Sequence, residues 1–333
     1  MMLSRLRTSK NRHPAPNVGF WRRLKWRWVG QDTWTGPGYP LAPTGKPGPI
    51  QDASFEYPSG DAAVILIHGL TGTPTEMRTV GKMIARGGYS VYGIQLAGHC
   101  GSENDLLQTN WHDWYASVEA AFEKIAAKHS VVFVGGLSMG AVLAIHLAAR
   151  HPDRISGLAL YSTTLEFDGW AVPKLSFLFP LFMNTPICER YRFVETFPYG
   201  IKDERLRTRI LNKMLSGDSA AAGTMGMTGR SLRELRRLVK LVKREMPEVH
   251  APALIVQAVH DDITSPKRNG DYLRDHLGGA TTTLSLDDSY HIVTIDRQHA
   301  LVASESVRFF DSIVQRDGVE VAVAASRGGA GRT

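Results

Sequence analysis

A five-residue motif, Gly136-Leu137-Ser138-Met139-Gly140, constrains the fold of this chain more than any other stretch. An apolar run, residues 131–134, comes directly before it, and a helix-forming run, residues 141–150, follows it. A strand, a one-residue corner and a helix fit this pattern, and such a corner exposes the serine hydroxyl at the carboxyl edge of a sheet. Glycines fit on both sides because a side chain there would collide with the backbone crossing beside it.

Strand-like and helix-like runs alternate on both sides of this motif. Strand-like runs, most of them apolar, lie at residues 62–67, 91–96, 131–134, 155–161, 253–259 and 282–286. Runs of helical composition or spacing lie at residues 75–86, 111–128, 141–150, 269–277 and 301–314. The alternation predicts a mostly parallel sheet with helices on both faces, and 333 residues suit one such domain with an insertion.

The alternation is interrupted between residues 166 and 247. Residues 170–183 are strongly apolar and aromatic, and residues 231–243 have the pattern of a basic amphipathic helix. An insertion at this point lies over the sheet edge that carries the serine, so we expect a cap. An apolar underside predicts a substrate with an apolar part, since hydrocarbon burial is worth about 25 cal/mol per Å². The candidate wall residues are Trp170, Phe179 and Phe182, with attachment of the cap to the sheet as their alternative role.

Positive charge is concentrated in a Trp-rich arm at the start of the chain. The net charge is +7, but residues 1–30 contain eight Lys or Arg and no acid, so the remaining chain is close to neutral. Interleaved Trp and Arg residues are typical of a segment on a membrane surface, and docking of the tryptophans on the catalytic domain is the alternative. No nucleic-acid reader module accompanies the arm, so no nucleic-acid partner is expected. The predicted boundaries are an arm and Pro/Gly linker at 1–54, a catalytic core at 55–165 and 248–316, a cap at 166–247 and a disordered tail at 317–333.

Targeting and redox signals are few in this sequence. No apolar run reaches the roughly 18 residues of a membrane span, and the basic start lacks the apolar core of a signal peptide. Cys100 and Cys188 form neither a disulfide framework nor a metal-ligand spacing. We therefore expect a cytoplasmic protein without a metal or cofactor, with peripheral membrane contact through the arm as a further expectation.

Two loops after later strands offer the partners that a nucleophilic serine needs. Serine attacks when a base takes its proton, and a histidine base needs an acid to fix its tautomer. The loop at 260–262, with the sequence His-Asp-Asp, follows one strand, and the loop at 287–291, which ends in histidine, follows the next. The order serine, acid, histidine suits this architecture. His291 is the candidate base, and the residues alone leave both Asp261 and Asp262 open as the acid.

A glycine-rich turn after the first buried strand is the candidate oxyanion hole. This turn, His68-Gly69-Leu70-Thr71-Gly72, lets backbone N–H groups face the serine. The N–H groups of Leu70 and Met139 would meet the negative charge of a tetrahedral intermediate, and one such donor contributes roughly 2.7–4 kcal/mol. His68 itself is expected to hold the loop.

Four ordered motifs, at residues 68–74, 136–140, 257–262 and 289–296, resemble the α/β-hydrolase superfamily, and in particular its small bacterial carboxylesterases and monoacylglycerol lipases. The resemblance implies an α/β-hydrolase fold with a helical cap. Matched position by position, it implies that the catalytic residues are Ser138 as nucleophile, Asp261 as acid and His291 as base, with Leu70 and Met139 as oxyanion donors. It favours Asp261 over Asp262 because the family's acid directly follows the residue matching His260.

Two features depart from that family pattern, since Tyr290 stands where a glycine is usual and the cap is longer and more basic. The expected function is a serine ester hydrolase that acts through an acyl-enzyme on esters with an apolar acyl chain, and the expected partner is a small-molecule ester or lipid. An acyltransferase, a carbon–carbon bond hydrolase or a slow-turnover receptor-type hydrolase would use the same triad. A haloalkane dehalogenase is excluded because it needs a carboxylate at position 138.

Overall fold

A seven-stranded sheet organises the part of the chain that this computed structural model describes, namely residues 50–172, 185, 192–194, 197–216, 219–223 and 226–329. The strand order is β1-β3-β2-β4-β5-β8-β9. The bounds are β1 Phe55–Tyr57, β2 Ala63–Ile67, β3 Ser90–Ile94, β4 Val132–Leu137, β5 Gly157–Tyr161, β8 Ala253–Ala258 and β9 Thr281–Leu286. Every neighbouring pair is parallel except β1 on β3. The predicted α/β-hydrolase sheet is therefore confirmed, with a short antiparallel edge strand that periodicity did not reveal.

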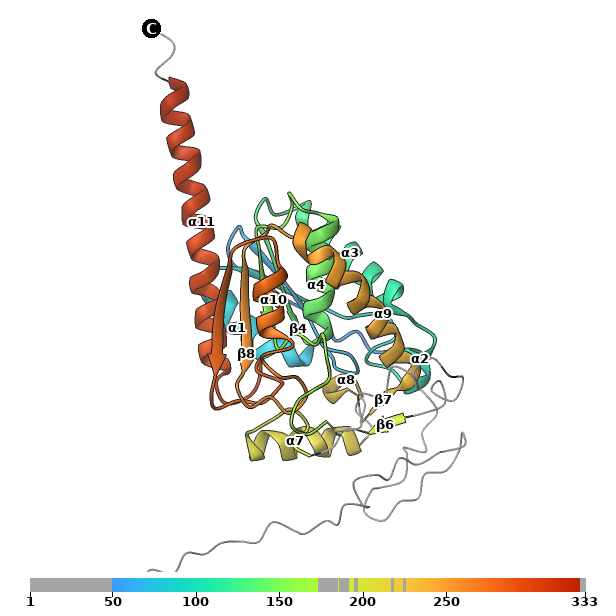
Figure 1. Cartoon of the computed structure of the whole chain (residues 1–333). Coiled ribbons are helices and arrows are strands. Elements are labelled where there is room, and N and C mark those ends of the chain that lie inside the picture. Colours follow the sequence, from blue (N-terminus) through green and yellow to red (C-terminus); the bar gives the residue numbers. More distant parts are fainter. Residues whose placement is uncertain are drawn as a thin grey trace, which may run out of the picture.

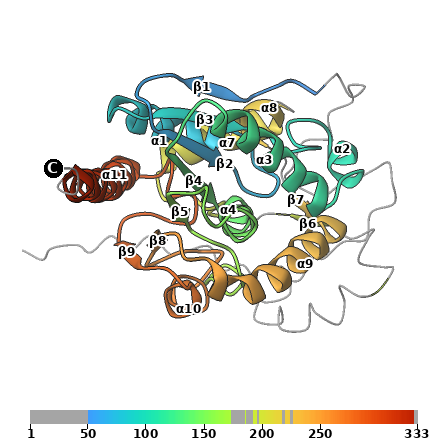
Figure 2. The same ribbon diagram turned by 90° about the horizontal axis from the view of Figure 1, so that it is seen from above.

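Helices cover both faces of this sheet (Figures 1 and 2). Their bounds are α1 Thr75–Arg86, α2 Glu103–Leu107, α3 Trp111–Ala126, α4 Met139–Arg150, α9 Gly229–Glu245, α10 Gly270–His276 and α11 His299–Gly329. Alternate residues of β2 enter two separate clusters: Ile65 packs with α3 and α4, and Leu66 packs with α1 and α11. Because both faces are covered, the central strands are apolar on both sides and read as continuous hydrophobic runs.

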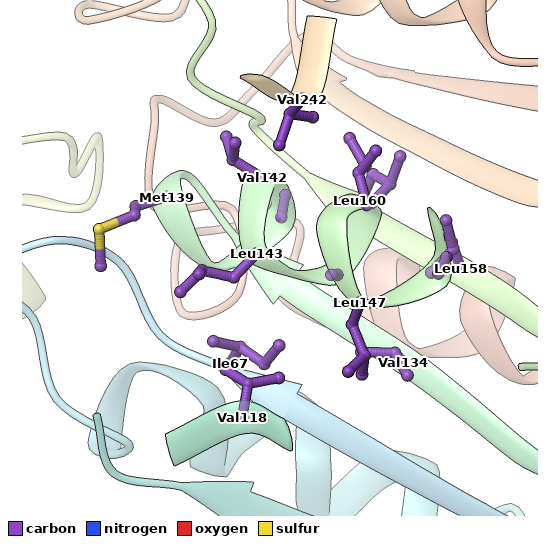
Figure 3. Close-up of a cluster of buried hydrophobic side chains, with 14 of the residues drawn as sticks. Ile67, Val118, Val134, Met139, Val142, Leu143, Leu147, Leu158, Leu160 and Val242 are labelled. Atoms are coloured by element: carbon purple, nitrogen blue, oxygen red, sulfur yellow. The ribbon is translucent and has the colours of Figure 1, made fainter. Parts of the chain in front are cut away.

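The helix that follows the serine corner, α4, is packed on two sides. Figure 3 shows Leu143 of α4 pointing toward Ile67 and Val118, and Val142 pointing toward Val242 of α9. Val242 is completely buried in the same cluster. The predicted cap range, 166–247, therefore includes a helix that belongs to the core layer, because the apolar stripe of α9 finds its partner on α4.

The remaining described elements of the predicted cap are small. They are β6 Arg192–Val194, α7 Glu204–Leu215, α8 Ser219–Ala222, β7 Gly226–Thr228 and the 3-10 turn Met246–Glu248. Strands β6 and β7 pair antiparallel in a sheet of their own. Helix α7 contains no fully buried residue and lies beneath the main sheet, at the end of the molecule opposite the projecting end of α11 (Figure 1).

The last helix is longer than the sequence predicted. We expected a helix at 301–314 and a disordered tail from residue 317, whereas α11 continues to Gly329 and projects past the body (Figure 1). Residues 317–329 contain three Val and three Ala, which a helix accommodates, although three Gly lower the helix propensity of the segment. The predicted arm lies almost entirely outside the described residues. Within the described ranges, no helix has the length and apolar character needed to cross a lipid bilayer.

Candidate active site

Ser138 stands at a strained corner between β4 and α4. Its backbone has φ 56° and ψ −113°, a conformation that L-residues rarely adopt outside such corners. A Cβ on Gly140 would collide with the carbonyl oxygen of Ile67, and one on Gly136 would collide with the backbone of Gly140. The steric reason predicted for both glycines is confirmed. The hydroxyl of Ser138 lies 2.8 Å from that of Thr164, and the residue is half-buried.

Asp261 and His291 form a buried pair at the ends of β8 and β9. Nδ1 of His291 lies 2.9 Å from one carboxylate oxygen of Asp261 and 3.1 Å from the other. The same carboxylate accepts hydrogen bonds from the N–H groups of Ile263 and Thr264, from the Thr264 hydroxyl and from the Gln257 amide, all at 2.8–2.9 Å. Donation from Nδ1 leaves Nε2 as the basic nitrogen of the imidazole. The arrangement can therefore hold His291 as a general base.

Asp262 is equally buried but faces other groups. One of its oxygens accepts from the backbone N–H of His291 at 3.3 Å, and the other accepts from the backbone N–H of Gly200 at 2.9 Å. Burial raises the pKa of Asp262, against the opposing charge of His291. The imidazole thus pairs with Asp261, and Asp262 supports the backbone of the histidine loop.

The candidate oxyanion turn lies beside the serine corner. Leu70 lines the same cavity as Ser138 and His291. The N–H of Met139 opens α4, where no carbonyl four residues earlier can accept it within the helix. The ring of His68 donates from Nδ1 to the carbonyl oxygen of Gly69 at 2.8 Å, because its Nε2 accepts from a backbone N–H, that of Leu96, at 3.2 Å. Burial, with a smaller contribution from His99, holds the pKa of His68 well below its ordinary value. A neutral His68 fits the loop-holding role expected of it.

A cavity of about 680 Å³ opens over Ser138 and His291. Its lining combines the oxyanion turn, the histidine loop and one long side of α7. The apolar side chains that line it include Leu137, Phe167, Leu206, Ile210, Met214 and Ile292. A space of this size with apolar walls suits a hydrocarbon chain beside the serine.

Of the three predicted wall residues, Trp170 alone lies among the described residues. Trp170 does not line this cavity; its side chain is 57% exposed, and its indole N–H donates to the carbonyl oxygen of His260 at 3.0 Å. Phe179 and Phe182 lie outside the described residues. Sequence analysis missed α7, although Leu206, Ile210 and Met214 recur every four residues and that spacing could have revealed an apolar helix face.

A third buried carboxylate, Asp296, was also missed. One of its oxygens accepts from the backbone N–H groups of Tyr290 and Lys202, each at 2.8 Å, and the other accepts from Asp203 N–H at 2.9 Å. The carbonyl oxygen of Gly200 accepts from Ile292 N–H at 2.8 Å. The segment that leads into α7 is therefore fastened to the histidine loop.

Comparisons with known proteins agree with this architecture. Residues 58–298 match the model of the family described as serine aminopeptidase, S33. The chain is 28% identical over 258 residues to a thermostable monoacylglycerol lipase of Bacillus sp. (strain H-257), covering 77% of this chain and 93% of the relative. It is 21% identical over 262 residues to a carboxylesterase of Bacillus subtilis (strain 168), covering 78% and 96%. The solved structure of a soluble variant of the Saccharomyces cerevisiae monoglyceride lipase superposes with a TM-score of 0.66 at 16% identity, covering 83% and 98%.

Proposed function

This chain belongs to the serine aminopeptidase S33 family of α/β hydrolases and is a serine ester hydrolase, and we propose that Ser138, His291 and Asp261 are its catalytic triad. The observation that carries this assignment is the buried pair of Asp261 and His291, whose carboxylate oxygen and Nδ1 lie 2.9 Å apart, with His291 lining the same cavity as the strained Ser138 corner. The pair supplies a base of fixed tautomer, and the corner presents a hydroxyl to it.

The proposed reaction has two halves. The Ser138 hydroxyl leaves its contact with Thr164, gives its proton to Nε2 of His291 and attacks the ester carbonyl. The N–H groups of Leu70 and Met139 stabilise the oxyanion, and Asp261 stabilises the imidazolium. The protonated His291 then donates to the leaving alcohol, and the same ring activates the water that releases the acid and regenerates the serine.

The proposed substrate is a carboxylic ester with one apolar acyl chain, such as a monoacylglycerol. A cavity of about 680 Å³ can hold a single chain, and its apolar wall on α7 would remove that chain from water. The bacterial relative that matches 77% of this chain is a monoacylglycerol lipase, which supports the same choice.

A peripheral position on a membrane surface is a further part of the proposal. Residues 1–30 carry eight Lys or Arg together with three tryptophans, a composition suited to anionic lipid headgroups. In this proposal the enzyme is a cytoplasmic protein that meets its lipid substrate at the bilayer.

A chain-length series tests the proposal. Purified protein is assayed on monoacylglycerols and p-nitrophenyl esters of increasing acyl length, with the released fatty acid identified by mass spectrometry. We expect turnover to favour medium or long chains, and Ser138→Ala to lower kcat by at least roughly 10³-fold with an unchanged melting curve. Undiminished release of fatty acid by Ser138→Ala would refute the assignment.

A further inference from the structure

Helix α7 presents an apolar stripe to the cavity. Leu206, Ile210 and Met214 follow one another at intervals of four residues, and all three line the cavity while remaining half-buried. This is the spacing that aligns side chains along one face of a helix. The stripe gives the acyl chain of the proposed substrate a wall.

A cationic stripe runs directly beside the apolar one. Arg205, Arg209 and Lys213 each precede one residue of the apolar stripe, so they occupy its flank, rotated by about 100° on the helix. All three are exposed, and all three also line the cavity. They therefore form a basic rim over the site.

Three described acids, Glu76, Asp203 and Asp296, line the same cavity as these cations, and Asp203 lies close enough to attract Arg205. Within the part of the chain that the structure describes, none of the three cations makes an ion pair. The nearby carboxylates have other tasks: Asp203 accepts the Leu206 N–H that opens α7, and Asp296 accepts three backbone N–H groups. Since no described acid forms an ion pair with the rim, most of its positive charge is available to a ligand.

We propose that the substrates of this enzyme are single-chain esters whose alcohol carries an anionic group, a phosphate above all. This inference rests on the proposed function and names its substrate class. The acyl chain lies against the apolar stripe of α7, and the phosphate meets the guanidinium groups of Arg205 and Arg209 and the ammonium group of Lys213. Arginine suits such a partner because its planar donors match phosphate oxygens in pairs. A cationic rim also raises the local concentration of an anionic substrate, an effect that added salt weakens.

Helix α9 offers a matched control. Arg236, Lys240 and Arg244 have the same spacing of four residues, are exposed and, among the described residues, make no ion pair. None of them lines the cavity. The α7 triple variant, R205Q/R209Q/K213Q, and the α9 triple variant, R236Q/K240Q/R244Q, therefore remove equal charge from two similar exposed stripes.

The test compares lauroyl glycerol with lauroyl glycerol phosphate in the full-length protein, both as monomers below their micelle concentrations. The readout is the ratio of kcat/KM for the phosphate ester to kcat/KM for the neutral ester. We expect the wild-type ratio to exceed one and the α7 variant to lower it by about tenfold or more, within the range of electrostatic steering. Added NaCl should lower the wild-type ratio, and the α9 variant should retain it.

The outcomes separate this inference from the proposed function. Turnover of the neutral ester with a ratio below one, or equal ratios in the two triple variants, would overturn the anionic substrate class and leave the esterase intact. A preference that appears with substrates in anionic vesicles, and is absent with monomers, would also overturn it and indicate bilayer docking. If the wild-type protein turns over neither ester, the result would instead count against the proposed function.

Discussion

At the scale of single residues, two adjacent aspartates have different roles because their hydrogen-bond partners differ. Asp261 faces the imidazole of His291, whereas Asp262 faces backbone N–H groups of His291 and Gly200. Both carboxylates are almost completely buried, so burial alone does not distinguish them. The direction of each side chain does, because only a carboxylate on Nδ1 can fix the tautomer of the ring.

The two aspartates are expected to respond differently to the same isosteric change. Asp261→Asn should lower kcat by roughly 10³- to 10⁴-fold, since an amide opposite Nδ1 favours the wrong tautomer. Asp262→Asn should lower kcat by less than about tenfold, because an amide oxygen can still accept from one backbone N–H. Steady-state kinetics on a p-nitrophenyl ester check both values. A larger loss in Asp262→Asn than in Asp261→Asn would contradict the assignment.

At the scale of elements, the site depends on a connection between α7 and the histidine loop. Asp296 accepts from Tyr290 of that loop and from Lys202 and Asp203 at the start of α7. The wall that would hold the acyl chain and the loop that carries the base are therefore one hydrogen-bonded unit. A substitution that displaces α7 should therefore also displace the histidine loop, and the reverse should hold.

Trimming the wall should affect long acyl chains selectively. Ile210 lines the cavity, whereas Leu215 is half-buried on the same helix and lies outside the lining. Ile210→Ala should weaken kcat/KM for a long-chain ester relative to a short one by about 1–3 kcal/mol, the range for removing hydrocarbon from a pocket. Leu215→Ala should leave that ratio near the wild-type value. An equal loss at every chain length for Ile210→Ala would show that this side chain supports the helix without touching the substrate.

Removing the Asp296 hydrogen bonds should lower both the free energy of unfolding and the activity. Asp296→Asn replaces one acceptor oxygen by a donor that faces backbone N–H groups, and hydrogen bonds to a buried charge contribute about 1.5–3 kcal/mol. Urea unfolding should therefore show a loss of about 2 kcal/mol, with a fall in kcat on long-chain esters. Asp287→Asn is the control, since that side chain is exposed on the same loop and accepts from the side chain of Gln298. Wild-type stability in Asp296→Asn would count against the connection.

At the scale of the whole molecule, the chain combines a near-neutral body with a strongly basic start. Residues 1–30 hold eight Lys or Arg and no acid, while the chain as a whole has a net charge of +7. Such a distribution suits a catalytic body brought to an anionic surface by a short basic segment. If the arm binds such a surface as proposed, the catalytic body should remain active without it.

Deletion of residues 1–30 should leave kcat/KM on a soluble short-chain ester unchanged and lower binding to anionic vesicles. Each basic residue near such a surface contributes roughly 1 kcal/mol, and added salt should weaken binding of the full-length chain. Co-sedimentation with vesicles measures the binding, and a melting curve on both proteins tests the alternative that the tryptophans pack on the body. Equal sedimentation of the two proteins would end the membrane proposal, and a lower melting temperature after deletion would favour packing.

The sequence by itself determined the α/β architecture and the order of the motifs. Continuous apolar runs, glycines flanking Ser138 and loops at strand ends are local features, and local features can be read from neighbouring residues. It also led to Ser138, Asp261 and His291 as the candidate catalytic residues, although the residues without the family resemblance left Asp262 open.

The tertiary structure alone decided which distant groups meet. It paired Asp261 with His291, fastened α7 to the histidine loop through Asp296, and put Leu206, Ile210 and Met214 on the cavity wall where Trp170 had been expected. None of these contacts follows from composition or periodicity, because a side chain's direction and its partner far along the chain depend on how the helices pack. The stripe on α7 was visible as spacing, but its place over the serine required the folded sheet.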